Sequence, residues 1–141
     1  MEQIDRLFLK VYPETAKEMS SRFRLSFYRQ AGDREKYASA AIEHYKKFPC
    51  KNSDELNEVA WTFFRISEDK KLLKQAVKWA KKSIKLDSNY YNHDTLAAIY
   101  NKLGKKKKAV KFANKAISIA KANGQDFTPT QELLDGIEKE S

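Results

Sequence analysis

Few side chains in this sequence could carry covalent chemistry. Cys50 is the only cysteine, and His44 and His93 are the only histidines. A reactive thiolate needs a base or positive charge beside it, and no histidine stands next to Cys50. The two histidines are separated by a full predicted hairpin and lack partners at metal-ligand spacing. No phosphate-binding loop, nucleophile elbow or paired-carboxylate motif is visible. We therefore expect no catalytic residue, no metal and no cofactor, in a protein that is not an enzyme.

Positive charge is the chemistry that the chain does carry, and it is unevenly spread. Residues 68–121 contain fifteen lysines and four acids, a net charge of +11, while the other residues sum to −2 and give the whole chain +9. Such a segment could bind nucleic acid or another anionic partner. Nucleic-acid sites usually mix arginine and stacking aromatics with lysine, whereas blocks of a single charge are commonly solvated. The pattern favours a solvated face, with nucleic-acid binding as the alternative.

The same lysine-rich part of the chain contains two segments that are near-copies of each other. Residues 76–84 (AVKWAKKSI) reappear 33 residues later as residues 109–117 (AVKFANKAI). A repeat of this length is typical of helical hairpins that stack on their neighbours, because one hairpin alone cannot bury its apolar face. The repeat predicts a binding surface rather than a catalytic pocket.

Apolar spacing, turn residues and caps predict the helices that position these side chains. After an N-terminal helix over 2–11, we expect a single domain over 1–141 with hairpins at about 14–48, 53–86 and 90–121 and a capping helix at about 128–140. Gly32 and Gly104 suit tight turns, Asp33 and Ser53 suit N-caps, and Thr128 begins a capping-box pattern with Pro129 at the helix start. The expected fold is all-α, a right-handed α-α superhelix.

Large aromatic residues occur at spacings that indicate a core rather than a cofactor site. They are Trp61, Phe63, Phe64, Trp79 and Phe112. Asp94 is expected to cap its own helix or to brace it against Trp61.

The third hairpin resembles a tetratricopeptide repeat, a helical hairpin of 34 residues. The residues at the family's signature spacing are Leu96, Ala97, Tyr100, Gly104, Ala109, Ala113 and Ala116. The small residues allow two helices to approach closely. The second hairpin matches well in its second helix, and the first hairpin matches loosely. Helical domains of this kind also extend the C-terminus of some bacterial thioredoxin-like proteins, and this chain, which lacks a Cys-x-x-Cys motif, would be only the extension.

The resemblance implies a concave groove lined by the first helix of each hairpin, with the lysine-rich second helices on the convex side. The groove positions that carry over to this chain form the candidate peptide-binding site: Arg22, Ser26, Arg29, Thr62, Arg65, Tyr91, Asn101 and Lys102, with Asp94 and Ala98 beside them. Four cations and one acid on such a surface would suit an acidic or C-terminal peptide, because arginine can grip a carboxylate with two hydrogen bonds.

The sequence thus predicts a protein-interaction module or scaffold that binds a peptide or a neighbouring domain. The alternatives are nucleic-acid binding through the lysine face and a ligand-free extension of a thioredoxin-like protein. No signal peptide or membrane-spanning run is visible, so we expect a soluble protein, cytoplasmic as written and periplasmic if it is part of a longer secreted protein. The oligomeric state is left open.

Overall fold

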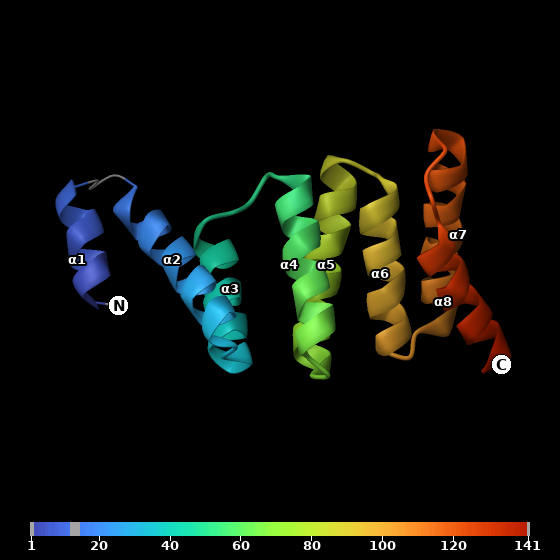
Figure 1. Ribbon diagram of the computed structural model, residues 1–141, viewed down its shortest axis with the longest axis horizontal. Coiled ribbons are helices and arrows are strands. Elements are labelled where there is room, and N and C mark those ends of the chain that lie inside the picture. Colours follow the sequence, from blue (N-terminus) through green and yellow to red (C-terminus); the bar gives the residue numbers. More distant parts are fainter. Residues whose placement is uncertain (1, 12–14, 141) are drawn as a thin grey trace. The chain divides into compact units, whose positions relative to one another are not determined.

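The computed structural model describes residues 2–11 and 15–140, and these residues form helices joined by short loops (Figure 1). The described part confirms the all-α prediction and contains eight helices: α1 (Glu2–Val11), α2 (Ala16–Ala31), α3 (Arg34–Lys47), α4 (Ser53–Ile66), α5 (Lys70–Leu86), α6 (Tyr90–Lys102), α7 (Lys106–Asn123) and α8 (Thr128–Lys139). Residues 1, 14 and 141, which bound the predicted domain and the first predicted hairpin, lie outside the described residues. No helix in the described ranges is long and apolar enough to cross a membrane.

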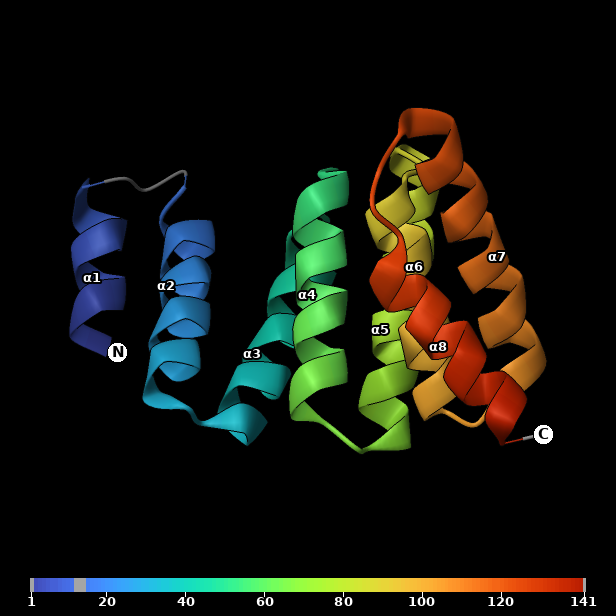
Figure 2. The same cartoon turned by 45° about the vertical axis from the view of Figure 1, so that its right-hand side comes forward.

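Helices adjacent in sequence pack largely as antiparallel pairs, of which α6/α7 and α4/α5 are the most extensive, followed equally by α2/α3 and α5/α6. The chain divides into two compact units, one ending at Cys50 and one beginning at Lys51. The first unit contains α1–α3, and the second contains α4–α8. Figure 2 shows α8 lying alongside α6 and α7 within the second unit.

The first unit contains a sharp turn between α2 and α3. Gly32 adopts the left-handed conformation (φ 71°), and its N–H donates to the carbonyl oxygen of Arg29. The Asp33 side chain then accepts a hydrogen bond from the N–H of Lys36 at the start of α3. Both predictions for this turn are therefore confirmed: glycine permits the positive φ, and aspartate satisfies an N–H at the helix start.

The second unit has the larger apolar core. Leu56 and Phe63 from α4, Leu73 from α5, and Leu96 and Ile99 from α6 are each at most 1% exposed. The alanines of the repeated segments are fully buried as well: Ala76, Ala80, Ala109, Ala113 and Ala116. Their small side chains let neighbouring helices approach closely, so the small residues of the repeat are packing residues.

Two predicted N-caps are wrong. Asn52, not Ser53, caps α4 by accepting a hydrogen bond from the N–H of Glu55. Ser53 instead donates to the carbonyl oxygen of Ser83 on α5. At α8 the N-cap position is Phe127, and no side-chain cap forms, although Pro129 does lie in the first turn. The hydroxyl groups of Thr128 and Thr130 are bonded to Asp126 and Asp94 instead.

The helices of the second unit recur at a longer interval than the sequence repeat. The starts of α4 and α6 are 37 residues apart, as are the ends of α5 and α7, while the starts of α5 and α7 and the ends of α4 and α6 are 36 residues apart. These intervals exceed the 33-residue offset of the near-copies by three or four residues, about one helical turn. A shift of one turn leaves a residue on the same helix face, which is why Ala76 and Ala80 are buried like Ala109 and Ala113. The sequence repeat therefore indicates correctly which helix face is buried. Its offset, however, differs by about one helical turn from the interval at which the helices themselves recur.

Candidate functional site

An aromatic side chain predicted to be in the core lies at the surface of α4. Trp61 is 37% exposed and stacks on the half-buried Phe64, with ring centroids 4.9 Å apart. The core prediction is wrong for Trp61, because the inward side of α4 is already occupied by its buried residues, which are Leu56, Val59, Ala60 and Phe63. The prediction is confirmed for Phe63 and Trp79, which are buried against each other edge to face.

Arg65 lies on the same side of α4 as this aromatic pair. Phe64 and Arg65 follow Trp61 by three and four residues, so both lie next to Trp61 on the surface of the helix. Arg65 is exposed. An exposed tryptophan beside an exposed arginine combines a large apolar surface with a planar, multiply donating cation.

Lys102 connects this part of α4 to α6. Its ammonium group lies 4.9 Å from the centre of the Phe64 ring, donates to the Phe64 carbonyl oxygen and pairs with Glu68 at 3.0 Å. Only 19% of its side chain is exposed. Lys102 therefore braces α6 against α4, and Glu68 offsets its charge.

Two other predicted groove residues are bonded within the protein. The Asn101 side-chain oxygen accepts a hydrogen bond from Lys106 at 2.9 Å, and Lys106 also pairs with Glu140. The Thr62 hydroxyl donates to the carbonyl oxygen of Glu58, one turn earlier in α4, at 2.8 Å. A ligand would have to compete with these bonds to use either group.

Tyr91, at the start of α6, is another exposed residue of the predicted groove. It is 61% exposed and contacts the Tyr90 ring edge to face. Tyr91 and Lys102 are eleven residues apart, about three helical turns, so they lie on the same side of α6. We name the set Trp61, Phe64, Arg65, Tyr91 and Lys102 the α4–α6 face.

The remaining predicted groove residues lie on α2, in the first unit. Arg22, Ser26 and Arg29 are exposed and follow one another at four and three residues, so they share a helix face. Arg22 pairs with Glu18 on the same helix at 3.2 Å. A groove that joins these residues to α4 and α6 stays a prediction.

A polar chain between α6 and α8 was not predicted. The Thr130 hydroxyl donates to the Asp94 carboxylate at 2.6 Å and lies 2.7 Å from the Tyr90 hydroxyl. Burial raises the pKa of Asp94, and the hydrogen bond from Thr130 opposes that shift. Asp94 therefore contacts α8 rather than bracing α6 against Trp61. No local pattern could have revealed this contact, because the two partners are 36 residues apart.

The lysines of α5 and α7 form a second charged surface in the second unit. These helices contain thirteen lysines and no acid, and every one of the lysines is exposed except Lys106, which is partly so. Lys81 of α5 and Lys108 of α7 lie 5.9 and 5.4 Å from the centre of the same ring, that of Tyr100. Lysines from both helices thus meet beside the Tyr100 ring.

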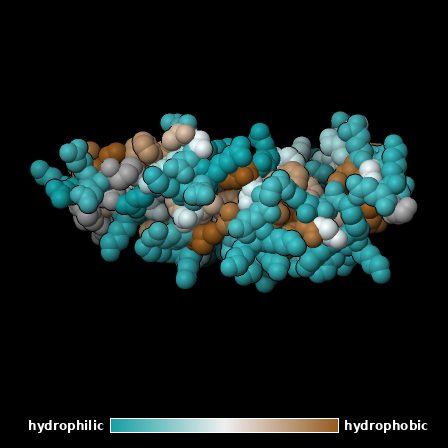
Figure 3. Space-filling model, turned by 90° about the horizontal axis from the view of Figure 1, so that it is seen from below, coloured by the Kyte–Doolittle hydropathy of each residue, from teal (hydrophilic) through white to brown (hydrophobic). Residues whose placement is uncertain are grey.

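Apolar groups reach the surface in small patches. The face drawn in Figure 3 is mostly hydrophilic, with separate hydrophobic areas between charged side chains. Among the described residues, no three His, Cys, Asp or Glu side chains gather closely enough to hold a metal ion. The comparisons with known proteins found no matching family, no matching curated protein and no matching solved structure.

Proposed function

We propose that this chain is a protein-interaction module that binds an acidic peptide or a neighbouring domain on the α4–α6 face. The observation that carries the proposal is the exposed Trp61, stacked on Phe64 beside Arg65. Tryptophan, tyrosine and arginine are the residues that most often dominate binding energy at protein interfaces. Phe64 and Lys102 hold the neighbouring surface in place, so binding loses little conformational entropy there.

The finer fold proposal is a superhelix of tetratricopeptide-like hairpins. The buried alanines of α5 and α7 and the positive φ of Gly104 support it. The recurrence of helix boundaries at 36 or 37 residues departs from the 34 residues of that family. In this proposal the chain is not an enzyme and works by binding alone. The alternative is that it is a ligand-free helical extension of a thioredoxin-like protein.

A peptide-binding experiment on the full chain tests the α4–α6 face. A peptide array containing acidic, neutral and basic sequences identifies a ligand, and the affinity of that ligand is then measured by fluorescence polarisation. We expect an acidic peptide to bind, and we expect Trp61→Ala to weaken it about 30-fold or more, as the loss of an interface hot spot of about 2 kcal/mol implies. Arg65→Ala should weaken the same peptide because its carboxylates lose a bidentate partner.

Leu86→Ala is the matched control, since Leu86 is a 44%-exposed apolar residue at the end of α5, outside the α4–α6 face. It should leave the affinity unchanged. Equal losses in Trp61→Ala and Leu86→Ala, or unchanged affinity in both Trp61→Ala and Arg65→Ala, would contradict the proposed surface.

The second candidate function is nucleic-acid binding through the lysines of α5 and α7. It is favoured by the absence of acids from both helices and by the approach of Lys81 and Lys108 to one ring. A gel shift at physiological salt tests it. Loss of binding at that salt would reduce the interaction to general electrostatics. Equal binding of another polyanion, such as heparin, would do the same.

A further inference from the structure

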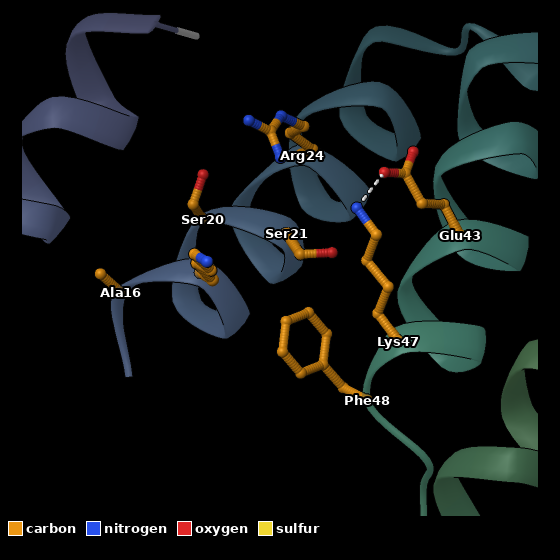
Figure 4. A pocket seen from close by; sticks show the side chains of 8 residues that line it. Ala16, Ser20, Ser21, Arg24, Glu43, Lys47 and Phe48 are labelled. Atoms are coloured by element: carbon orange, nitrogen blue, oxygen red, sulfur yellow. Dashed lines mark hydrogen bonds and ion pairs between the residues drawn. The ribbon is translucent and has the colours of Figure 1, made fainter. Parts of the chain in front are cut away.

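The first unit contains a pocket between α2 and α3 that has no part in the function proposed above. Figure 4 shows it, with the side chains of Ser21 from α2, of Lys47 at the end of α3 and of Phe48, the next residue, pointing into the space between the helices. Its volume is about 210 Å³, the volume of roughly seven water molecules in the liquid. The residues that line it are Ala16, Lys17, Ser20, Ser21, Arg24, Glu43, Lys47 and Phe48.

Helical spacing explains why polar groups converge in this pocket. On α2 the lining residues Lys17, Ser21 and Arg24 follow one another at four and three residues, and therefore share one face. On α3, Glu43 and Lys47 are one turn apart and form an ion pair at 2.8 Å. The pocket is thus built from two helix faces turned toward each other.

The lining carries an excess of positive charge. It contains three cations and one carboxylate, that of Glu43. The hydrogen bond from Lys47, with a smaller contribution from the charge of Arg24, lowers the pKa of Glu43, so the carboxylate is ionised at neutral pH. The net charge of the lining is therefore +2. A neighbouring hollow on the same helix pair has two cations, Arg24 and Lys36, and two acids, Glu35 and Glu43, so its charges balance.

A buried side chain holds one of the pocket's hydroxyl groups in place. His44 is fully buried, and its Nδ1 lies 2.8 Å from the Ser21 hydroxyl oxygen. In the tautomer that carries the proton on Nδ1, His44 donates to the Ser21 oxygen, which leaves the Ser21 O–H available to a ligand. The His44 ring also lies 5.4 Å from the Phe48 ring, which forms an apolar wall of the pocket. A hydroxyl group and a flat apolar surface are thereby fixed side by side.

We propose that this pocket binds the phosphoryl group of a small phosphate monoester. A phosphoryl group carries about −1.5 to −2 charges at neutral pH and three strong acceptor oxygens, which match a lining of +2 that includes a guanidinium, two ammonium groups and two serine hydroxyls. A carboxylate would neutralise only half of that charge. The organic part of the ester lies against Phe48 and Ala16.

Titration of the full chain, labelled with ¹⁵N, with phenyl phosphate tests the proposal. We expect saturable shifts in the NMR signals of amides around the pocket on α2 and α3. Benzoate, which has the same ring and one negative charge, should bind about tenfold more weakly or worse, as expected when a charge-assisted hydrogen bond is lost. The affinity for phenyl phosphate should rise with pH through about 6, where the phosphoryl group gains its second charge.

Matched variants separate the pocket from general attraction to a basic protein. Arg24→Met should weaken phenyl phosphate binding about tenfold or more. Lys46→Met makes the same change of charge on an exposed residue of α3 that does not line the pocket, and it should leave the affinity unchanged. Far-UV circular dichroism shows whether both variants remain helical.

Three results would overturn the proposal. One is a similar loss of affinity in Lys46→Met and Arg24→Met, and another is equal affinity for benzoate and phenyl phosphate. The third is a set of shifts that falls on α5 and α7 instead of α2 and α3, which would assign anion binding to the lysine surface.

Discussion

At the residue scale, Asp94 has surroundings that its position in the sequence does not suggest. Its carboxylate is partly buried between α6 and α8 and accepts one hydrogen bond, from Thr130. Because an ionised carboxylate only accepts hydrogen bonds, Thr130 must use its single proton on Asp94, and the Tyr90 hydroxyl then donates to Thr130. The donor and acceptor roles of all three hydrogen-bonded groups therefore follow from the charge of Asp94.

The raised pKa of Asp94 predicts a specific dependence of stability on pH. Since the folded pKa lies above the ordinary value of 3.8, the folded state holds the proton more tightly than the unfolded state. The contribution of Asp94 to the free energy of unfolding therefore falls as pH rises from about 3.8 through the raised pKa. Asp94→Asn, which can still accept from Thr130, should gain stability relative to the unmodified chain over that range, as measured by urea unfolding at several pH values.

Asp126 provides a control, because its pKa is shifted in the opposite direction to that of Asp94. The hydrogen bonds from Thr128 lower the pKa of this fully exposed carboxylate, so its contribution is present above its ordinary pKa and is lost as pH falls. Asp126→Asn should therefore show the reverse trend or none. A rising relative stability in both variants would mean that the Asp94 trend does not come from burial.

At the element scale, α8 is held to the second unit by apolar contacts and by the polar chain through Thr130. Leu134 packs with Ala97, Ala113 and Ile117 in one buried cluster. Thr130 is fully buried and supplies the hydrogen bonds to α6. Apolar packing brings α8 to this surface, and the polar chain favours one register of the helix.

Thr130→Val tests how much the polar chain contributes to the docking of α8. Valine has nearly the shape of threonine but leaves Asp94 and Tyr90 without this partner, which should lower the free energy of unfolding by about 1–3 kcal/mol. Thr128→Val is the matched change two residues earlier, where the hydroxyl is exposed, and it should stay within about 0.5 kcal/mol. Urea unfolding of both variants at one pH gives the comparison, and equal effects would show that Thr130 is not a special contact.

At the scale of the whole molecule, the two units differ in how much apolar surface they bury. Of the largest fully buried side chains among the described residues, only His44 belongs to the first unit, whereas Phe63, Leu56, Leu73, Leu96 and Ile99 belong to the second. The buried apolar residues of the first unit are mostly alanines, which contribute little hydrophobic free energy each. A unit of about fifty residues with such a core is marginally stable.

Hydrogen exchange should therefore differ between the units. We expect the most protected amides of α2 and α3 to exchange at least tenfold faster than those of α4–α7, a difference of about 1.4 kcal/mol in opening free energy. Exchange followed by mass spectrometry or NMR on the full chain measures this directly. Equal protection in both units would show that the first unit gains stability from a source other than its own core.

Much of the helical architecture follows from the sequence alone, because it depends on neighbours along the chain. Gly32 and Asp33 form the predicted turn and cap, since both act within a few residues of their own position. The alanine and lysine pattern of residues 76–84 and 109–117 likewise indicates which side of each helix is buried. Burial along a helix recurs about every 3.6 residues, so it can be read without a partner.

The candidate site was decided by tertiary structure, because its contacts join residues far apart in sequence. Trp61 and Phe63 are two residues apart in an apolar helix, and only the packing of α4 leaves one at the surface and the other in the core. Lys102 becomes a brace because the turn after α4 places Glu68 within 3.0 Å. The pocket between α2 and α3 depends on the pairing of the two helices. Its polar lining residues come from both helices, and the spacing within either one does not show that they meet. Local periodicity determines which face of a helix is apolar, but only the packed fold determines which charged and aromatic groups meet.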